Sequence, residues 1–177
     1  MRSFIPRLDI LPAPQQQIWG ALRSSAPLGF VLYGGTAIAL RLGHRPSVDF
    51  DFFTDQPLDK DALRAAFPFI PTSTVLQDTL NTFTVLIRAS AAPTDQVKVS
   101  FFGAIRFGRI GEPEMTDDGV LQVASLDDLL ANKLKVIFQR VEAKDYLDVA
   151  ALLAAGVRLD EGLAGARVLF GPNFQPC

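Results

Sequence analysis

The segment 34–53 constrains the fold and the chemistry of this chain more than any other part of it. It reads Gly-Gly-Thr-Ala-Ile-Ala-Leu-Arg-Leu-Gly-His-Arg-Pro-Ser-Val-Asp-Phe-Asp-Phe-Phe. The apolar run 28–33 predicts a buried strand, and the two glycines end that strand before an Ala- and Leu-rich stretch with helical spacing. The run 48–53 alternates like a second strand, which places Asp49 and Asp51 on one face and apolar side chains on the other.

The glycine turn and the acidic pair both suit a nucleoside triphosphate with its metal ion. Glycine has no Cβ, so phosphate oxygens can reach the backbone N–H groups of Gly34, Gly35 and Thr36, where the helix dipole favours negative charge. Asp49 and Asp51 repel each other unless a cation lies between them, which makes them candidate ligands of Mg²⁺ or Mn²⁺. Glycine turns and solvated acidic strands each occur without such a function, so the hypothesis depends on their succession in one segment.

The same segment resembles the first motif of the AbiEii/AbiGii-type toxin nucleotidyltransferases, a branch of the DNA polymerase β-like nucleotidyltransferase superfamily. A second stretch is similar to that family's Lys…Arg…(Arg/Lys)-Asp-x-x-Asp-Leu helical segment, and it comprises 128–135, Arg140 and 144–149. The resemblance implies an α+β (mixed α/β) nucleotidyltransferase-like fold. Its small mixed sheet would be flanked by helices and followed by a C-terminal helical segment.

The resemblance also implies an activity and a biological setting. The expected enzyme is a Mg²⁺-dependent nucleotidyltransferase that moves a nucleotide from a nucleoside triphosphate to an acceptor, either tRNA or protein. It would be the toxin-like component of a toxin–antitoxin or phage-defence system, with a cognate antitoxin as partner. The residues expected at the site are Asp49 and Asp51 for metal binding and catalysis, Lys133 and Asp148 for catalysis, and Gly34, Gly35, Thr36, Arg41 and Lys133 for nucleotide binding.

Ser100 departs from the pattern of the family. A third acid often stands there within Val-Lys-Val-Asp-Phe, whereas the strand expected at 96–102 reads Gln-Val-Lys-Val-Ser-Phe-Phe. A hydroxyl cannot offset the charge of a second divalent ion and is a poor general base. Three explanations stay open: another acid replaces it, either Asp148 from a helix or Asp95 through a β-bulge; one metal ion and a lysine suffice; or transfer is lost and a nucleotide- or partner-binding module remains.

The rest of the chain predicts one domain over 1–177, with 125–155 as a helical C-terminal part and 158–177 as a poorly defined tail. Asp59 and Ser125 are expected N-caps. The remaining predicted elements are helices at 15–24, 59–67, 126–141 and 144–155, strands at 82–88 and 96–102 joined by a turn at 91–94, and a loop-rich connection at 103–119 with a short strand.

Composition excludes several classes of protein and site. The 177 residues, 49% of them hydrophobic, suffice for one hydrophobic core. The sequence has no apolar run that approaches the ~20 residues of a membrane helix, and its start lacks the apolar core of a secretion signal. A cytoplasmic protein is therefore expected. Cys177 and His44 are the only residues of their types, which excludes a Ser-His-Asp triad and a cysteine-based zinc site. His44 is expected to cap a helix or to pack.

The formal net charge of −2 and the pI of 5.3 exclude a broad basic surface for nucleic acid. A confined basic patch remains compatible with these values. Seven basic residues fall in or near the two motifs: Arg41, Arg45, Lys98, Lys133, Lys135, Arg140 and Lys144.

Overall fold

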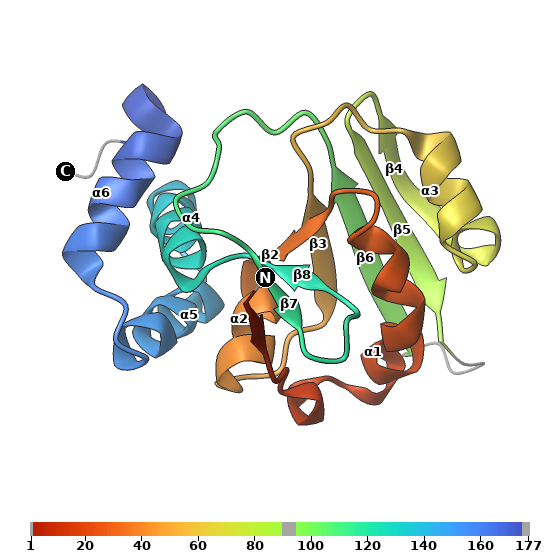
Figure 1. Ribbon diagram of the computed structural model, residues 1–177, viewed down its shortest axis with the longest axis horizontal. Coiled ribbons are helices and arrows are strands. Elements are labelled where there is room, and N and C mark those ends of the chain that lie inside the picture. The colour runs from red at the N-terminus through yellow and green to blue at the C-terminus, as the bar shows by residue number, and fades with distance from the viewer. Residues whose placement is uncertain (1, 90–94, 175–177) are drawn as a thin grey trace.

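A mixed sheet of eight strands forms the centre of the molecule in a computed structural model that describes residues 2–89 and 95–174 (Figure 1). The strand order is β1-β7-β8-β2-β3-β6-β5-β4. The strands are β1 Ser3–Phe4, β2 Val31–Tyr33, β3 Asp49–Phe53, β4 Thr74–Thr79, β5 Thr82–Arg88, β6 Gln96–Phe102, β7 Glu114–Thr116 and β8 Gln122–Val123.

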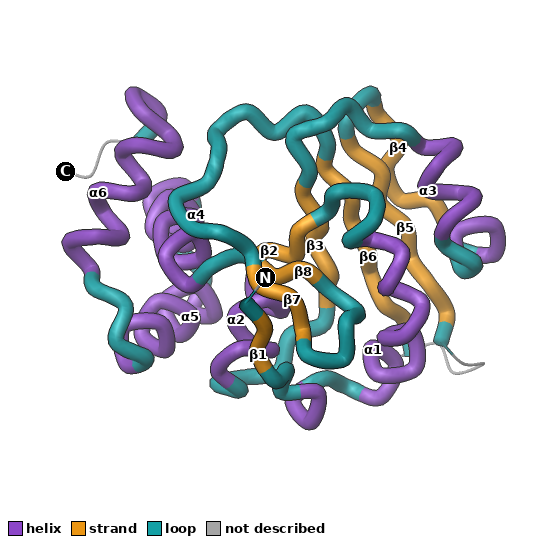
Figure 2. The backbone as a smooth tube through the Cα atoms, viewed as in Figure 1, coloured by secondary structure: helices purple, strands orange, loops and turns teal. Residues whose placement is uncertain are grey.

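Helices cover both faces of this sheet, with α1 and α3 on one side and α4, α5 and α6 grouped on the other (Figures 1 and 2). The mixed α/β class predicted from the sequence is confirmed. The helices are α1 Ala13–Ile18, α2 Gly34–Leu42, α3 Lys60–Ala66, α4 Leu126–Gln139, α5 Ala143–Ala154 and α6 Leu159–Phe170, and the 3-10 turns are Leu8–Ile10, Trp19–Ser25, Ile70–Thr72 and Gly171–Asn173.

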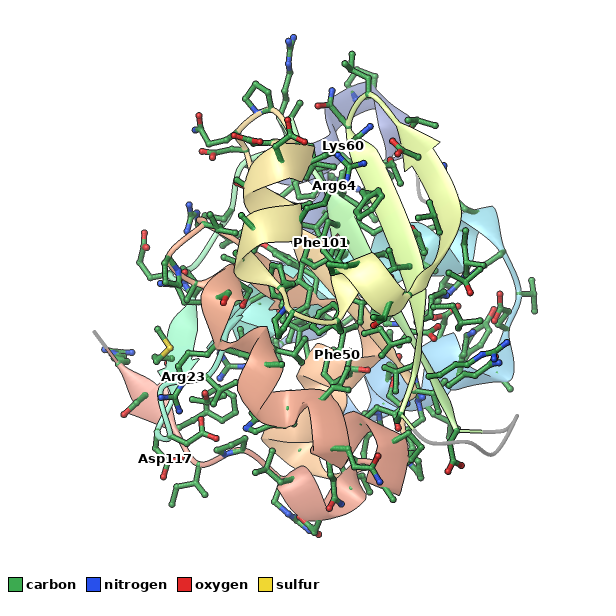
Figure 3. All side chains as sticks on the ribbon, turned by 90° about the vertical axis from the view of Figure 1, so that its right-hand side faces the viewer. Arg23, Phe50, Lys60, Arg64, Phe101 and Asp117 are labelled. Atoms are coloured by element: carbon green, nitrogen blue, oxygen red, sulfur yellow. The ribbon has the colours of Figure 1, made fainter. Side chains whose placement is uncertain are left out.

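Strand β3 lies in the middle of the sheet because alternate side chains of Asp49–Phe53 are apolar. Phe50 and Phe52 are fully buried, and the ring of Phe52 stacks at 5.5 Å on that of Phe101 from β6. Figure 3 shows Phe50 and Phe101 in the interior beneath α1 and α3. Since successive side chains of a strand point to opposite faces, Asp49 and Asp51 are turned to the α4 side of the sheet.

Helix α6 corrects the expectation that 158–177 is a poorly defined tail. It runs from Leu159 to Phe170 and packs along α4. Two glycines lower its helix propensity and conceal it in the sequence, but each permits a close approach. A Cβ on Gly162 would lie 2.4 Å from Leu130 Cδ2, and one on Gly165 would lie 2.3 Å from Ile110 Cδ1.

Other differences from the prediction concern short or polar segments. The helix expected at 15–24 is α1 followed by a 3-10 turn, and the strand expected at 28–33 is confined to Val31–Tyr33. Strand β4 was not predicted, because all six of its residues are exposed at a sheet edge and carry no burial pattern. The predicted turn at 91–94 lies outside the described residues. None of the described helices has the length and apolarity that a membrane crossing requires.

Candidate active site

The glycine turn and the acidic pair line the same cavity, whose volume is about 370 Å³. Strand β2 ends at Tyr33, and α2 begins at once with Gly34, whose φ of +77° favours glycine. A Cβ on Gly34 would lie 3.2 Å from Asp51 Oδ2, so the turn and the carboxylate are neighbours. The N-cap residue Tyr33 makes no side-chain capping hydrogen bond, which leaves the first turn of α2 without a side-chain cap.

The two carboxylates differ in their surroundings. Asp49 Oδ2 lies 2.8 Å from Nζ of Lys98, which faces it in register on β6, and this contact raises the pKa of Lys98. Asp51 is more buried, and its burial and the charge of Asp49 both raise its pKa. The charge of Lys98 and a hydrogen bond with Ser100 lower the pKa of Asp51, but they do not cancel the rise. Asp51 therefore lacks full compensation by cations of the protein.

This donor set fits a magnesium ion that arrives with a nucleotide. The described residues hold no group of three or more His, Cys, Asp or Glu side chains that could bind a metal alone. Mg²⁺ commonly takes one or two carboxylates, and phosphate oxygens and water complete its octahedron. Asp49 and Asp51, adjacent on one face of β3, provide the protein share of such a site.

A cationic wall lines the cavity around the acidic pair. Of the side chains described along the cavity, five are basic and two are acidic, although the whole chain has a formal charge of −2. This local excess of positive charge suits a polyphosphate. The basic side chains are Arg45, Lys98, Lys133, Arg140 and Lys144, five of the seven that the sequence places in or near the motifs.

Asp148 lies behind the cavity lining and forms ion pairs with two basic side chains of the cationic wall, Arg45 and Lys133. Its side chain is fully buried and accepts from His44 Nε2 at 2.7 Å and from Arg45 Nε and Nη2 at 2.7 and 2.9 Å. Lys133 Nζ lies 2.6 Å from its second oxygen. Burial alone would raise the pKa of Asp148, but the hydrogen bonds from these three side chains outweigh burial and hold that pKa well below its usual range.

Asp145 has the same role and lies about one helical turn before Asp148 on α5. Its buried carboxylate accepts from Lys133 Nζ at 2.8 Å and from Arg140 Nε at 2.9 Å, and the pKa of Asp145 is lowered although burial acts in the opposite direction. The two carboxylates thus hold Lys133 on the cavity wall. Because Asp148 does not itself line the cavity, it does not supply the missing third carboxylate, contrary to one of the explanations for Ser100.

These lowered pKa values predict that the protein loses stability in acid. The usual aspartate pKa is 3.8, so the unfolded chain takes up these protons at a higher pH than the folded chain. The stability that Asp145 and Asp148 provide is therefore complete above about pH 5 and falls as the pH drops further. Urea unfolding should show that Asp148→Asn destabilises the protein less at pH 3 than at pH 7. An equal difference at both pH values would contradict the assignment.

Arg41 lies outside the cavity, contrary to its expected role in nucleotide binding. Its guanidinium is held by Glu114 Oε2 at 2.7 Å and by the carbonyl oxygens of Val123 and Ala124 at 3.1 and 3.0 Å. It also covers the ring of Phe4 at 4.3 Å. Arg41 projects from α2 toward β7 and β8, so its charge organises that edge of the sheet.

The hydroxyl of Thr36 is also committed elsewhere. Thr36 is buried, and its hydroxyl contacts Ser47 Oγ at 2.8 Å and the carbonyl oxygen of Asp49. It therefore ties the start of α2 to the start of β3 and does not face a phosphate. His44 packs as expected, but against Asp148.

Strand β6 excludes Asp95 as a replacement acid. The register of β6 against β3 and β5 is regular from Gln96 to Phe102, without the bulge that would turn Asp95 to the acidic face. Lys98, by contrast, has the parity of Ser100 and faces Asp49. Its place at the site was not predicted, because it depends on the pairing of β6 with β3.

Comparison with known proteins identifies relatives of this arrangement. Residues 18–171 match the family described as "Nucleotidyl transferase AbiEii toxin, Type IV TA system". A curated but uncharacterized protein of Aquifex aeolicus (strain VF5) is 32% identical over 126 residues, which cover 70% of this chain. The matched segment spans only 57% of the length of that relative.

Two solved structures share the fold. A putative nucleotidyltransferase from H. pylori superposes with a TM-score of 0.64 at 21% identity, covering 88% of this chain and 73% of that one. The antibiotic-resistance factor ANT(2'')-Ia superposes with a TM-score of 0.58 at 13% identity, covering 85% of this chain and 88% of that one. At these identities the likeness concerns the fold alone.

Proposed function

Because this chain belongs to the AbiEii family of nucleotidyl transferase toxins of type IV toxin–antitoxin systems, we propose that it transfers a nucleotide from a nucleoside triphosphate to an acceptor hydroxyl. One observation carries the proposal: Gly34, Gly35, Asp49, Asp51 and the five basic side chains line a single cavity. Its volume of about 370 Å³ lies within the range of ligand sites.

The triphosphate would lie between the start of α2 and the cationic wall. Backbone N–H groups at Gly34 and Gly35 would hold the β and γ phosphates, helped by the dipole of α2. Lys133 and Arg45, fixed by Asp148, would offset the charge of the phosphates. Asp49 and Asp51 would hold Mg²⁺ or Mn²⁺, which when bound neutralises charge that develops as pyrophosphate leaves.

Ser100 favours a single metal site over a pair of metal sites. Its small side chain is buried beside Asp51, and neither Asp95 nor Asp148 lies where a third carboxylate would be needed. Lys98 and Lys133 supply fixed positive charge near the acidic pair. Of the three explanations for Ser100, one metal ion assisted by lysine therefore agrees best with the geometry.

The direct test is incubation with α-labelled and γ-labelled nucleoside triphosphates, Mg²⁺ and either total tRNA or protein. Label from the α position on an RNA or protein product supports nucleotidyl transfer and identifies the acceptor. Release of free phosphate alone would indicate hydrolysis and contradict the proposal. Replacing Mg²⁺ with Mn²⁺ or EDTA in the same assay tests the metal.

A second candidate is a nucleotide- or partner-binding module that has lost transfer, because the hydroxyl of Ser100 stands where relatives often carry a third acid. Such a protein would be stabilised against heating by nucleoside triphosphate and would yield no labelled product. In either case the toxin family makes a cognate antitoxin the partner to look for, and co-expression of the neighbouring gene tests this.

Gly35→Ala is expected to weaken nucleotide binding. A Cβ there would lie 2.6 Å from Arg45 Nη2 and 3.1 Å from Ser47 Oγ, so Arg45 must leave its place on the cavity wall. We expect KM for the triphosphate to rise on the order of tenfold, which is about 1.4 kcal/mol of binding. Gly20→Ala is the matched control, because nothing lies within 4 Å of a Cβ at that position. An unchanged KM in Gly35→Ala would contradict the binding of a phosphate between the turn and Arg45.

A further inference from the structure

A small recess opens beyond the acidic pair, on the side of the cavity away from α2. We name it the aromatic recess; it shares Tyr33 and Phe53 with the catalytic cavity and is bounded across from them by Phe107 and Gly108. Its volume of about 80 Å³ is a fraction of the 370 Å³ of the cavity. It can therefore receive a portion of a ligand that extends out of the cavity, and is too small for a second complete nucleotide.

The recess lies directly in line with the acidic pair. Asp49, Asp51 and Phe53 occupy one face of β3 at steps of two residues, so Phe53 lies about 7 Å beyond Asp51. Tyr33 pairs with Asp51 in register on β2. The surface thus changes from charged to aromatic over roughly the width of a ribose.

The walls of the recess are preformed. The ring of Phe53 stacks at 4.8 Å on Phe102, and Tyr33 meets it edge-on at 5.3 Å. Burial raises the pKa of Tyr33 to about 12, so its phenol stays neutral beside a ligand. Both aromatic walls offer flat apolar surface of the kind on which nucleobases stack.

The opposite wall belongs to the connection from β6 to β7, which arches from the sheet toward α4 (Figure 2). Asp128 of α4 accepts from the N–H groups of Ile110 and Gly111 at 2.8 and 3.0 Å. Phe107 packs at 5.1 Å against Phe170 of α6. These contacts fix the connection, and exposed Arg109 is part of the lining of the recess.

The direction of nucleotidyl transfer decides which ring the recess receives. In the proposed reaction the attacking oxygen approaches the α-phosphorus opposite the departing pyrophosphate. The pyrophosphate leaves toward Gly35 and Arg45, so the acceptor enters from the side of Phe53. Resting on the proposed function, we propose that the aromatic recess binds the nucleoside ring of the acceptor.

The transfer step conserves atoms, electrons and the proton of the acceptor. The acceptor hydroxyl forms a new O–P bond to the α-phosphorus, and the bond between that phosphorus and the bridging oxygen to the β-phosphate breaks. Pyrophosphate takes the bond electrons, and the hydroxyl proton is released to solvent water. Arg109 would meet a phosphate attached to the acceptor.

Phe53→Leu tests the assignment, because it removes the stacking surface and keeps apolar bulk. We use single-stranded hexaribonucleotides and free nucleoside 5′-monophosphates as two sources of the same chemistry. With the acceptor that becomes labelled, Phe53→Leu should raise the acceptor KM by about 5- to 150-fold, the range expected for one stacked base, and leave the triphosphate KM unchanged. Phe138→Leu is the control: it alters a ring that is 50% exposed and meets Phe174 edge-on, and Phe138 lines neither the cavity nor the recess.

Several results would overturn the inference while leaving the proposed transfer intact. A rise of the triphosphate KM in Phe53→Leu would place the donor base in the recess. An unchanged acceptor KM in Phe53→Leu would contradict binding of the acceptor there. Labelling of a protein acceptor would show that the acceptor carries no nucleoside ring. If no acceptor is labelled at all, the proposed function fails separately. In that case fluorescence anisotropy measures binding of the hexaribonucleotide to the protein in the presence of a non-hydrolysable triphosphate and Mg²⁺. Weaker binding by Phe53→Leu than by Phe138→Leu would support the inferred role of the recess. Equal binding by the two variants would overturn that role.

Discussion

Asp49→Asn is expected to abolish nucleotidyl transfer while leaving the fold intact. The amide removes one of two negative charges on the acidic face of the cavity, so the metal site loses half of its protein charge. We expect kcat/KM to fall at least about 10³-fold, which is roughly 4 kcal/mol of transition-state stabilisation. The loss should appear in α-label transfer with Mg²⁺ and with Mn²⁺.

The stability of Asp49→Asn should remain close to that of the natural protein. Asp49 is 38% exposed, and its partner Lys98 is 39% exposed, so the ion pair that is lost is a surface pair worth less than about 1 kcal/mol. Asp78→Asn is the matched control, because Asp78 is 41% exposed on β4 and pairs with Lys60 and Arg64. Full activity in folded Asp49→Asn, or equal inactivation by Asp78→Asn, would contradict the metal assignment.

The sequence predicts the centre of this site well because local rules suffice there. The glycines, the helix after them and the alternation of Asp49–Phe53 are properties of neighbouring residues. Pairing β3 with β2 and β6 then brings turn and acids together. The role of Lys98 needs the additional knowledge that β3 and β6 are neighbours, which parity alone does not give.

The fate of individual polar side chains could not be read from spacing. Arg41 and Thr36 lie in the first motif, yet one binds Glu114 and the other binds Ser47, because each helix residue points where its own angle around the axis directs it. The resemblance predicts that Asp148 lies at the site. In the structure Asp148 does not line the cavity and instead holds Arg45 and Lys133, which do. Helix α6 was missed because its glycines serve contacts with distant residues.

The layer behind the cavity explains how so many cations can be held together. The positive charges of Lys133, Arg45 and Arg140 would repel one another. The buried carboxylates of Asp145 and Asp148 provide two negative charges between them, which offset this repulsion. Arg45 follows α2, whereas Lys133 belongs to α4, so Asp148 of α5 ties the sheet to the helical region of the chain. Charge on the wall and cohesion of the fold thus depend on the same side chain.

Asp148→Ala is accordingly expected to cause the largest loss of stability. It leaves His44, Arg45 and some of the charge of Lys133 without their buried acceptor, and breaking a buried charge network in this way costs about 3–5 kcal/mol. For a chain of this size the melting temperature should fall by roughly 6–20 °C, as measured by circular dichroism or calorimetry. Asp160→Ala on α6 is the control, because it removes an aspartate paired with Arg158 at the exposed surface and should leave the melting temperature unchanged. If the two variants melted alike, Asp148 would not hold the sheet and the helices together, and the cationic wall would need another support.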